Sequence, residues 1–248
     1  MRRKVIAGNW KMNMLPNEAI SFIENLAPMV KDSENEVIIC VPYTDLFYSL
    51  LTAQNTRIKI GAQNMHWEEK GAYTGEISAP MLKSIGVEYV IIGHSERREY
   101  FLETDEDVNK KVKAALKNEL KPIVCVGETL EQREQGIQEQ IITSQTKLAL
   151  EGLNKEQLQN IIIAYEPVWA IGTGKTATSE DANEAIKSIR NQVEKDFGNE
   201  IAQNIIILYG GSVKPENSKE LFSMSDIDGG LVGGASLKVD DFSKIVSA

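Results

Sequence analysis

The sequence has few cysteines, few histidines and no long apolar segment. Cys40 and Cys125 are the only cysteines among 248 residues, and each lies in an apolar strand-like run, so we expect buried, reduced thiols. His66 and His94 are the only histidines, and no clustered ligand motif includes them, so we expect no metal. No run approaches the length of a membrane span, and Val5-Ile6-Ala7 is too short for a signal-peptide core. We therefore expect a cytoplasmic, metal-free protein.

The net charge is strongly negative, at −9 for 27 basic and 36 acidic side chains. A surface of this sign repels nucleic acid and anionic membranes, so we expect neither as a partner. It does not exclude a small anionic substrate, because backbone N–H groups can form a local positive site on an acidic protein.

Eight short apolar runs recur along the chain, separated by segments that can each hold a helix. Dividing 248 residues by eight gives 31 residues per unit, about the size of one strand and one helix. Alternating strands and helices form a parallel sheet, and eight units without a linker favour one α/β domain, residues 1–248, closed as a (β/α)8 barrel. The runs are Val5–Trp10, Val37–Val41, Ile58–Ala62, Tyr89–Ile92, Pro122–Val126, Ile161–Tyr165, Ile205–Tyr209 and Leu231–Val232.

Helix boundaries can be predicted at several places between these runs. An apolar stripe from Ala182 to Phe197 predicts a helix with Ser179 as its N-cap and Gly198 at its end. Thr104 and Asp107 have the spacing of a capping box, and Pro215 has the position expected in a first helical turn.

The most informative stretch is Ile161–Ala177, where Glu166 directly follows a buried strand and Pro167 ends that strand. A lone acid at the C-terminal end of a parallel strand lies where ligands bind in such folds. Two nucleotide motifs in the loop are incomplete. A P-loop ending in Gly174-Lys175-Thr176 would need glycine where Trp169 stands, and the G-x-G-x-x-A from Gly172 begins too far from its strand.

Other polar residues also follow predicted strands and would meet at the same barrel mouth. Each residue also has a purely structural interpretation: Lys11 could be a solvated cation, His94 a core histidine with both ring nitrogens hydrogen-bonded, and the glycines residues that form turns. Their occurrence together at one barrel mouth favours a functional site. The residues concerned are Asn9, Lys11, His94, Glu128, Glu166, Ser212, Gly233 and Gly234.

Five ordered motifs resemble the triosephosphate isomerase family over essentially the whole chain. They are Ala7–Asn13 (AGNWKMN), Gly93–Arg98 (GHSERR), Ala164–Trp169 (AYEPVW), Tyr209–Val213 (YGGSV) and Leu231–Leu237 (LVGGASL). The resemblance implies a TIM barrel that needs no cofactor. It also implies interconversion of dihydroxyacetone phosphate and D-glyceraldehyde 3-phosphate through an enediolate, a step of glycolysis and gluconeogenesis.

The resemblance also assigns roles to four residues. Glu166 would be the base that moves a proton between adjacent carbons, and His94 the acid at the substrate oxygens. Lys11 would hold the substrate and stabilise the oxyanion, with Asn9 adding a hydrogen bond. Because the polar turn after His94 suits a helix start, whose dipole opposes positive charge, we expect a neutral imidazole.

By the same resemblance the phosphate would bind backbone N–H groups of Gly172, Ser212, Gly233 and Gly234. Glycine suits such a site because a Cβ would block close approach. Pro167–Ala177 would form a lid, with hinges at Pro167-Val168-Trp169 and Lys175-Thr176-Ala177. Two further residues, Glu96 and Cys125, would support the site without contacting the substrate.

The segment Asn64–Ile77 predicts a homodimer. It is long for a strand-to-helix connection and carries Met65, Trp67 and Tyr73, which we expect a monomer to expose to water. The alternative is a loop folded on its own side chains. In the family this loop enters a pocket of the other subunit around Met14, so we expect dimerisation to order the active site.

Two other functions remain open from the residues alone. A different isomerase acting on sugar phosphates could share the phosphate cradle but would have no reason to combine Lys11, His94 and Glu166. A phosphometabolite-binding protein without catalysis could use the same scaffold, since fold does not fix function, but would be expected to lose one of these residues.

Overall fold

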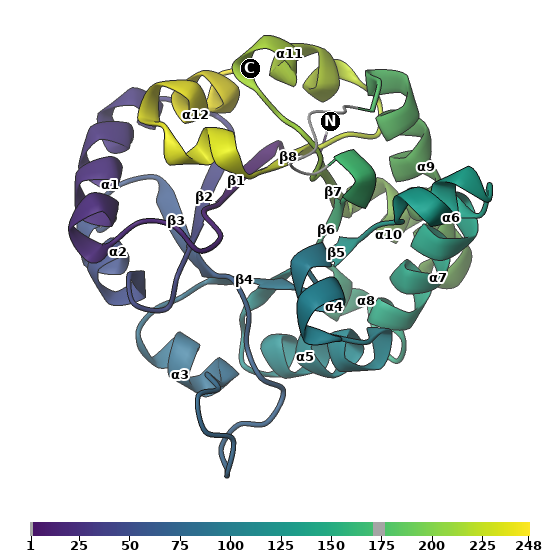
Figure 1. Ribbon diagram of the computed structural model, residues 1–248, viewed down its shortest axis with the longest axis horizontal. Coiled ribbons are helices and arrows are strands. Elements are labelled where there is room, and N and C mark those ends of the chain that lie inside the picture. Colours follow the sequence, from purple (N-terminus) through teal and green to yellow (C-terminus); the bar gives the residue numbers. More distant parts are fainter. Residues whose placement is uncertain (1, 171–176) are drawn as a thin grey trace.

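The computed structural model describes residues 2–170 and 177–248, and its described part is built on one closed barrel. Eight parallel strands pair in chain order, and β8 pairs with β1 to complete the ring of a single-domain TIM barrel. Figure 1 shows the helices arranged around this ring. The strands are β1 (Val5–Asn9), β2 (Glu36–Val41), β3 (Ile58–Ala62), β4 (Tyr89–Ile92), β5 (Lys121–Val126), β6 (Ile162–Tyr165), β7 (Ile206–Tyr209) and β8 (Gly229–Val232).

Helices occupy the connections between successive strands. They are α1 (Pro16–Val30), α2 (Leu46–Thr52), α3 (Ala79–Ser84), α4 (Ser95–Phe101), α5 (Asp105–Lys117), α6 (Leu130–Glu134), α7 (Gln138–Leu150), α8 (Lys155–Leu158), α9 (Ser179–Phe197), α10 (Asn199–Asn204), α11 (Pro215–Ser223) and α12 (Val239–Val246), with short 3-10 helices η1 (Val168–Ala170) and η2 (Gly234–Leu237). None of the helices in the described part is long and apolar enough to cross a membrane.

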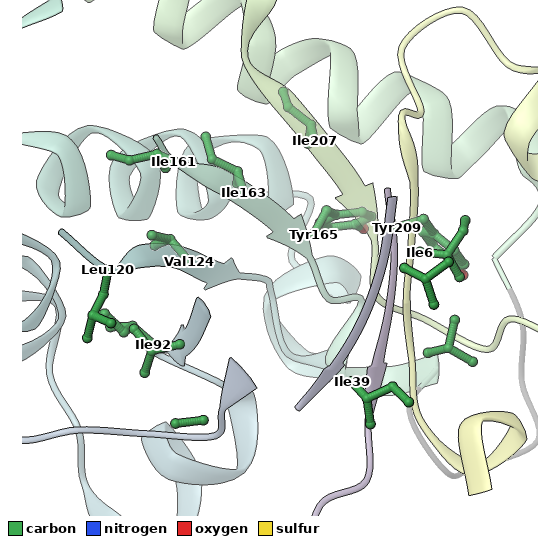
Figure 2. Close-up of a cluster of buried hydrophobic side chains, with 14 of the residues drawn as sticks. Ile6, Ile39, Ile92, Leu120, Val124, Ile161, Ile163, Tyr165, Ile207 and Tyr209 are labelled. Carbon is green, nitrogen blue, oxygen red and sulfur yellow. The ribbon is translucent and has the colours of Figure 1, made fainter. Parts of the chain in front are cut away.

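Two apolar layers follow from the alternation of side chains along each strand. On β5, Ile123 and Cys125 face the barrel interior, whereas Val124 and Val126 join the larger layer between the barrel and its helices. Figure 2 shows part of that outer layer, including Val124, Ile163 and Ile207. Both faces of the strands are buried, which explains why the strands read as continuous apolar runs.

The predicted strands and helix ends are largely confirmed, with small shifts. The prediction that Ser179 caps α9 is wrong: Thr178 is the N-cap, and its hydroxyl accepts the N–H of Asp181 at 3.0 Å. Ser179 is instead the first helical residue and donates to Glu220 at 2.7 Å. Gly198 does end the helix, and Thr104 with Asp107 does form a capping box.

The β3–α3 connection, Asn64–Ile77, projects from the barrel (Figure 1). The expectation that Met65 would be exposed in a monomer is wrong, because its side chain is fully buried in the core of its own chain. The rings of Trp67 and Tyr73 lie 4.3 and 4.5 Å from the ring of His66, so the loop packs partly on itself. Tyr73 nevertheless remains 45% exposed.

Strand β8 begins two residues earlier than predicted, at Gly229. A Cβ at this residue would lie 1.9 Å from the carbonyl oxygen of Val5, and the φ of Gly229 is +135°. Glycine is therefore required where β8 meets β1, since any side chain would collide with the neighbouring backbone.

We expect Gly229→Ala to lower the free energy of unfolding by about 3 kcal/mol or more, because it combines a backbone collision with positive φ. Gly136→Ala is the matched control: its φ is +72° but its Cβ would meet no atom within 4 Å, so about 1 kcal/mol is expected. Urea denaturation measures both. Equal losses would contradict the role assigned to the β1–β8 contact.

Candidate active site

Asn9 ends β1 and fixes the turn that presents Lys11. The Asn9 side chain is 5% exposed, and its Oδ1 accepts the backbone N–H of Lys11 at 3.0 Å. Lys11 has φ +55°, a conformation that few non-glycine residues adopt. Gln63, which follows β3, donates through Nε2 to the carbonyls of Lys11 and Cys40 at 2.9 and 3.0 Å. Gln63 was not predicted, and it holds this unusual turn from two strands away.

Lys11 and Glu96 form an ion pair across the barrel mouth. Lys11 Nζ lies 2.7 Å from Glu96 Oε1, and both side chains are partly exposed. Glu96 belongs to the first turn of α4, so the pair joins the end of β1 to the start of that helix. The contact places the Lys11 ammonium beside the cavity that it lines.

His94 is itself the N-cap of α4. Its Nδ1 accepts the backbone N–H of Glu96 at 3.2 Å, and its Nε2 lies 2.9 Å from Glu166 Oε1. A nitrogen that accepts an N–H carries no proton of its own, so the neutral ring with its proton on Nε2 satisfies both contacts. The helix start expected after His94 is therefore confirmed.

Glu166 follows β6 and is 2% exposed. Its Oε1 contacts His94, and its Oε2 accepts the backbone N–H of Ser95 at 2.9 Å. The burial of Glu166 raises its pKa, but His94 and the Ser95 N–H more than offset this and leave the pKa below its ordinary value of 4.5.

The contact between His94 and Glu166 raises the pKa of His94, whereas it lowers the pKa of Glu166. Burial lowers the pKa of His94, and the Glu166 carboxylate outweighs it, so the pKa lies above the ordinary 6.5. The start of α4 and Glu166 thus have opposite effects on His94. The Glu96 N–H that donates to Nδ1 favours the neutral ring, and the Glu166 carboxylate favours the cation.

Glycines on both sides make room for Glu166. A Cβ at Gly127, after β5, would lie 1.8 Å from the carbonyl oxygen of Glu166, and one at Gly210, after β7, would lie 2.9 Å from its Cγ. The strands neighbouring β6 are therefore each followed by a glycine, because the backbone of residue 166 occupies the space beside Gly127 and the Glu166 side chain occupies the space beside Gly210.

A cavity of about 520 Å³ brings most of the predicted residues together at the barrel mouth, whereas Glu128, which was expected at the same mouth, is fully buried and is not among the lining residues. Glu96 lies beside it through Lys11, and the lysines Lys214 and Lys238 add positive charge to its wall. Gly172 lies outside the described residues. The predicted residues that line the cavity are Asn9, Lys11, His94, Glu166, Ser212, Gly233 and Gly234.

Cys125 does not line this cavity. It is fully buried in the inner layer of the barrel, where burial and then the nearby Glu166 carboxylate raise the pKa of its thiol. The thiol is therefore protonated at neutral pH and contributes packing under Glu166.

Glu128 organises the start of the predicted lid, a role that the sequence did not assign to it. Its fully buried carboxylate accepts from Trp169 Nε1 at 2.8 Å, from the Tyr165 hydroxyl at 3.1 Å and from Arg133 at 3.3 Å. Arg133 also lies 4.7 Å from the centre of the Trp169 ring. The available signal was its position two residues after the predicted strand Pro122–Val126.

The predicted hinges are only partly described. Val168-Trp169-Ala170 form η1, whereas residues 171–176, which include Lys175 and Thr176 of the second hinge, lie outside the described part. Within that part, no group of three His, Cys, Asp or Glu side chains could hold a metal ion.

The coupling of His94 to Glu166 predicts a pH dependence. Because the pKa of His94 is raised on folding, His94 stabilises the fold below pH 6.5, and this stabilisation is lost as the pH rises through the folded-state pKa of His94. Because the pKa of Glu166 is lowered on folding, Glu166 stabilises the fold above pH 4.5, and this stabilisation is lost as the pH falls through the folded-state pKa of Glu166. The pair therefore contributes most between these two values.

We expect the NMR titration midpoint of His94 to exceed 6.5 in the ligand-free protein and to fall below it in Glu166→Gln, where burial acts without the opposing charge. His66, the other histidine, is the internal control because it lies outside this cavity. A His94 midpoint that does not move in the variant would contradict the coupling.

Comparison with known proteins agrees with this geometry. A family model described as triosephosphate isomerase matches residues 4–248. The triosephosphate isomerase of Thermoanaerobacter pseudethanolicus is 60% identical over 247 residues, covering 100% of both chains. That of Caldanaerobacter subterraneus subsp. tengcongensis is 58% identical with the same coverage, and that of Clostridium tetani is 55% identical over 100% of this chain and 97% of its own. The chain therefore belongs to the triosephosphate isomerase family.

Proposed function

We propose that the chain interconverts dihydroxyacetone phosphate and D-glyceraldehyde 3-phosphate through an enediolate, as a cytoplasmic enzyme of glycolysis and gluconeogenesis. The observation that carries this proposal is the convergence of Lys11, His94 and Glu166 on one cavity that also holds the glycine-rich turns after β7 and β8. Membership of the triosephosphate isomerase family supports the same reaction.

Glu166 is the proposed base. Its lowered pKa keeps it ionised at neutral pH, and burial leaves the carboxylate poorly hydrated and therefore reactive towards a C–H proton. It removes a proton from one carbon of the substrate while the electron pair forms the enediolate double bond. The resulting carboxylic acid then returns the proton to the adjacent carbon, so the net reaction moves two hydrogens and consumes no other reactant.

His94 is the proposed acid at the substrate oxygens. Its Nδ1 is held by the Glu96 N–H, which leaves Nε2–H to donate. When Glu166 turns to the substrate carbon, the main cause of the raised His94 pKa is removed. Burial and the helix start then favour the neutral ring, whose Nε2–H supplies a proton to the developing oxyanion. The Nε2 then takes a proton from the hydroxyl on the neighbouring carbon, so the ring is neutral again when the product forms.

Lys11 and Asn9 are proposed to stabilise negative charge on the same oxygen. Lys11 is held by Asn9, Gln63 and Glu96, so its ammonium is positioned before the substrate arrives. Preorganised charge of this kind costs no reorganisation during the reaction, which is why it lowers the barrier effectively.

The phosphate is proposed to bind at Ser212, Gly233 and Gly234, with Gly172 as a further donor. A Cβ built on Gly234 would meet no atom within 4 Å, and one on Gly233 would approach only Lys11 Cε at 3.8 Å. The space beside these two residues is open, so a phosphate can approach their backbone N–H groups closely. Lys214 and Lys238 line the same cavity together with the acidic Glu216 and Asp241, so the proposal assigns the phosphate to the backbone N–H groups.

A lid from Pro167 to Ala177 is proposed to exclude water, since an enediolate in water can eliminate its phosphate. The Glu128–Trp169 hydrogen bond ties the start of this segment to the end of β5. The proposal therefore includes Glu128 as a residue that positions the lid.

We also propose a homodimer in which the Asn64–Ile77 loop contacts the second subunit. Fifteen large apolar side chains of the described residues are exposed, and thirteen of them lie in segments that follow β1 to β4, on one half of the barrel. Such one-sided exposure is typical of an interaction surface. It includes Leu15, Phe47, Tyr73, Met81 and Phe101.

The test of the reaction is isomerisation of D-glyceraldehyde 3-phosphate by purified protein, with and without a chelator. We expect chelator-insensitive turnover that falls by about 10²–10⁴-fold in Glu166→Gln, which removes the base and keeps its shape. Glu156→Gln on the exposed helix α8 is the control and should retain full turnover. Activity unaffected by Glu166→Gln would refute the assignment of the base, and no turnover in folded wild-type protein would favour a binding protein.

The test of the dimer is Tyr73→Asp, which places a charge on the most exposed ring of the loop. We expect dimer dissociation to become easier by about 2 kcal/mol or more, and turnover at high dilution to fall with it. Sedimentation and turnover measured on the same samples check both, with Leu148→Asp on α7 as the control. A monomer with full turnover would show that dimerisation does not order the site.

A further inference from the structure

A second cavity meets Glu166 and belongs to a different part of the molecule. Its volume is about 650 Å³, and it lies between α4, the connection from β5 to α6, and η1. Among the described residues that line the two cavities, Glu166 is the only one that they share. One buried residue thus borders two spaces, each of a size that holds small molecules.

The wall of this second cavity is apolar on one side. Val126 is buried in the outer core layer, Leu130 begins α6 and is 41% exposed, and Val168 and Trp169 come from η1. These aliphatic and aromatic groups offer a hydrophobic contact surface for a planar ligand. The predicted phosphate turns after β7 and β8 are not part of this wall.

The other side of the cavity is polar but disfavours anions. Arg98 is the only lysine or arginine among its described lining residues. Its guanidinium is engaged, since it donates to the carbonyls of Gly93 and Cys125 and pairs with Asp105 at 2.6 Å. Glu99 and Glu166 also line the cavity, and no second cation does among the described residues, so a phosphate would meet net repulsion there.

Hydrogen-bonding groups at this side suit an amide. Gln145 lines the cavity, and its Oε1 accepts the Gly127 N–H at 2.8 Å, which fixes the side chain and leaves its NH₂ group as a donor. Ser95 also lines the cavity. The Gln145 NH₂ group can donate to a carbonyl, and the exposed carboxylate of Glu99 can accept from an N–H.

We propose that this second cavity is a binding site for small uncharged aromatic amides, and that its occupant lowers turnover without competing for the substrate. The Ser95 N–H already holds Glu166 Oε2 at 2.9 Å. An occupant that fills the cavity beside Glu166 stabilises that position and opposes the turn of Glu166 towards a substrate carbon. The effect on turnover rests on the proposed role of Glu166, whereas the binding does not.

The probe pair is benzamide and benzoate, which have nearly the same shape and differ in charge. We expect benzamide to give saturation-transfer NMR signals that persist when inorganic phosphate is added, and benzoate to give much weaker ones. In steady-state kinetics, benzamide should lower kcat and leave KM unchanged, because the phosphate turns do not contact it.

Leu130→Glu is the variant that tests the location. It adds a charge to the apolar wall at an exposed position in the first turn of α6, where an acid is compatible with the helix. We expect benzamide affinity to fall at least about tenfold, since the ring would pack against a charge. Leu148→Glu, with a similarly exposed leucine (39%) outside the cavity, should bind benzamide as the wild type does.

Displacement of benzamide by phosphate, equal binding by Leu130→Glu, or no benzamide signal would overturn the site. Benzamide that binds as expected but raises KM alone would overturn the mechanism of inhibition. If the folded protein shows no isomerase activity, the function proposed above fails, and the NMR comparison with Leu130→Glu still decides whether the site exists.

Discussion

The pairing of His94 with Glu166 is the interaction on which the rest of the site depends. It joins the ends of β4 and β6, two strands separated by β5, through a 2.9 Å contact between nearly buried side chains. Each partner sets the other's pKa, and the N–H groups of Ser95 and Glu96 at the start of α4 fix one atom of each. A short helix therefore orients both the proposed acid and the proposed base.

This arrangement imposes requirements on the surrounding backbone. Gly127 leaves room for the backbone carbonyl of Glu166 and Gly210 leaves room for its side chain. Lys11 reaches the same mouth through a positive-φ turn held by Asn9 and Gln63. The barrel supplies this precision, since its strands are buried on both faces and their ends have little freedom.

Glu166 is the described residue that lines both cavities, which links the proposed reaction to the proposed amide site. Towards the barrel axis it meets the cavity with Lys11 and the phosphate turns, and on the other side it meets the cavity bounded by Leu130 and Trp169. A base that must move between a resting contact and a substrate needs space around it, and such space can admit another molecule.

The sequence by itself determined the eight strand-helix units, the cap at Thr104 and the end of α9 at Gly198. It also determined which polar and titratable residues follow the strands. These features depend on local periodicity and on residue types. Only the tertiary structure decided what depends on neighbours distant in the chain. Gln63 and Glu128 acquire their roles through contacts across strands, Met65 is buried by its own chain, and β8 begins at Gly229 because β1 approaches it there. Such contacts carry no local signal, since register and closure of the barrel create them.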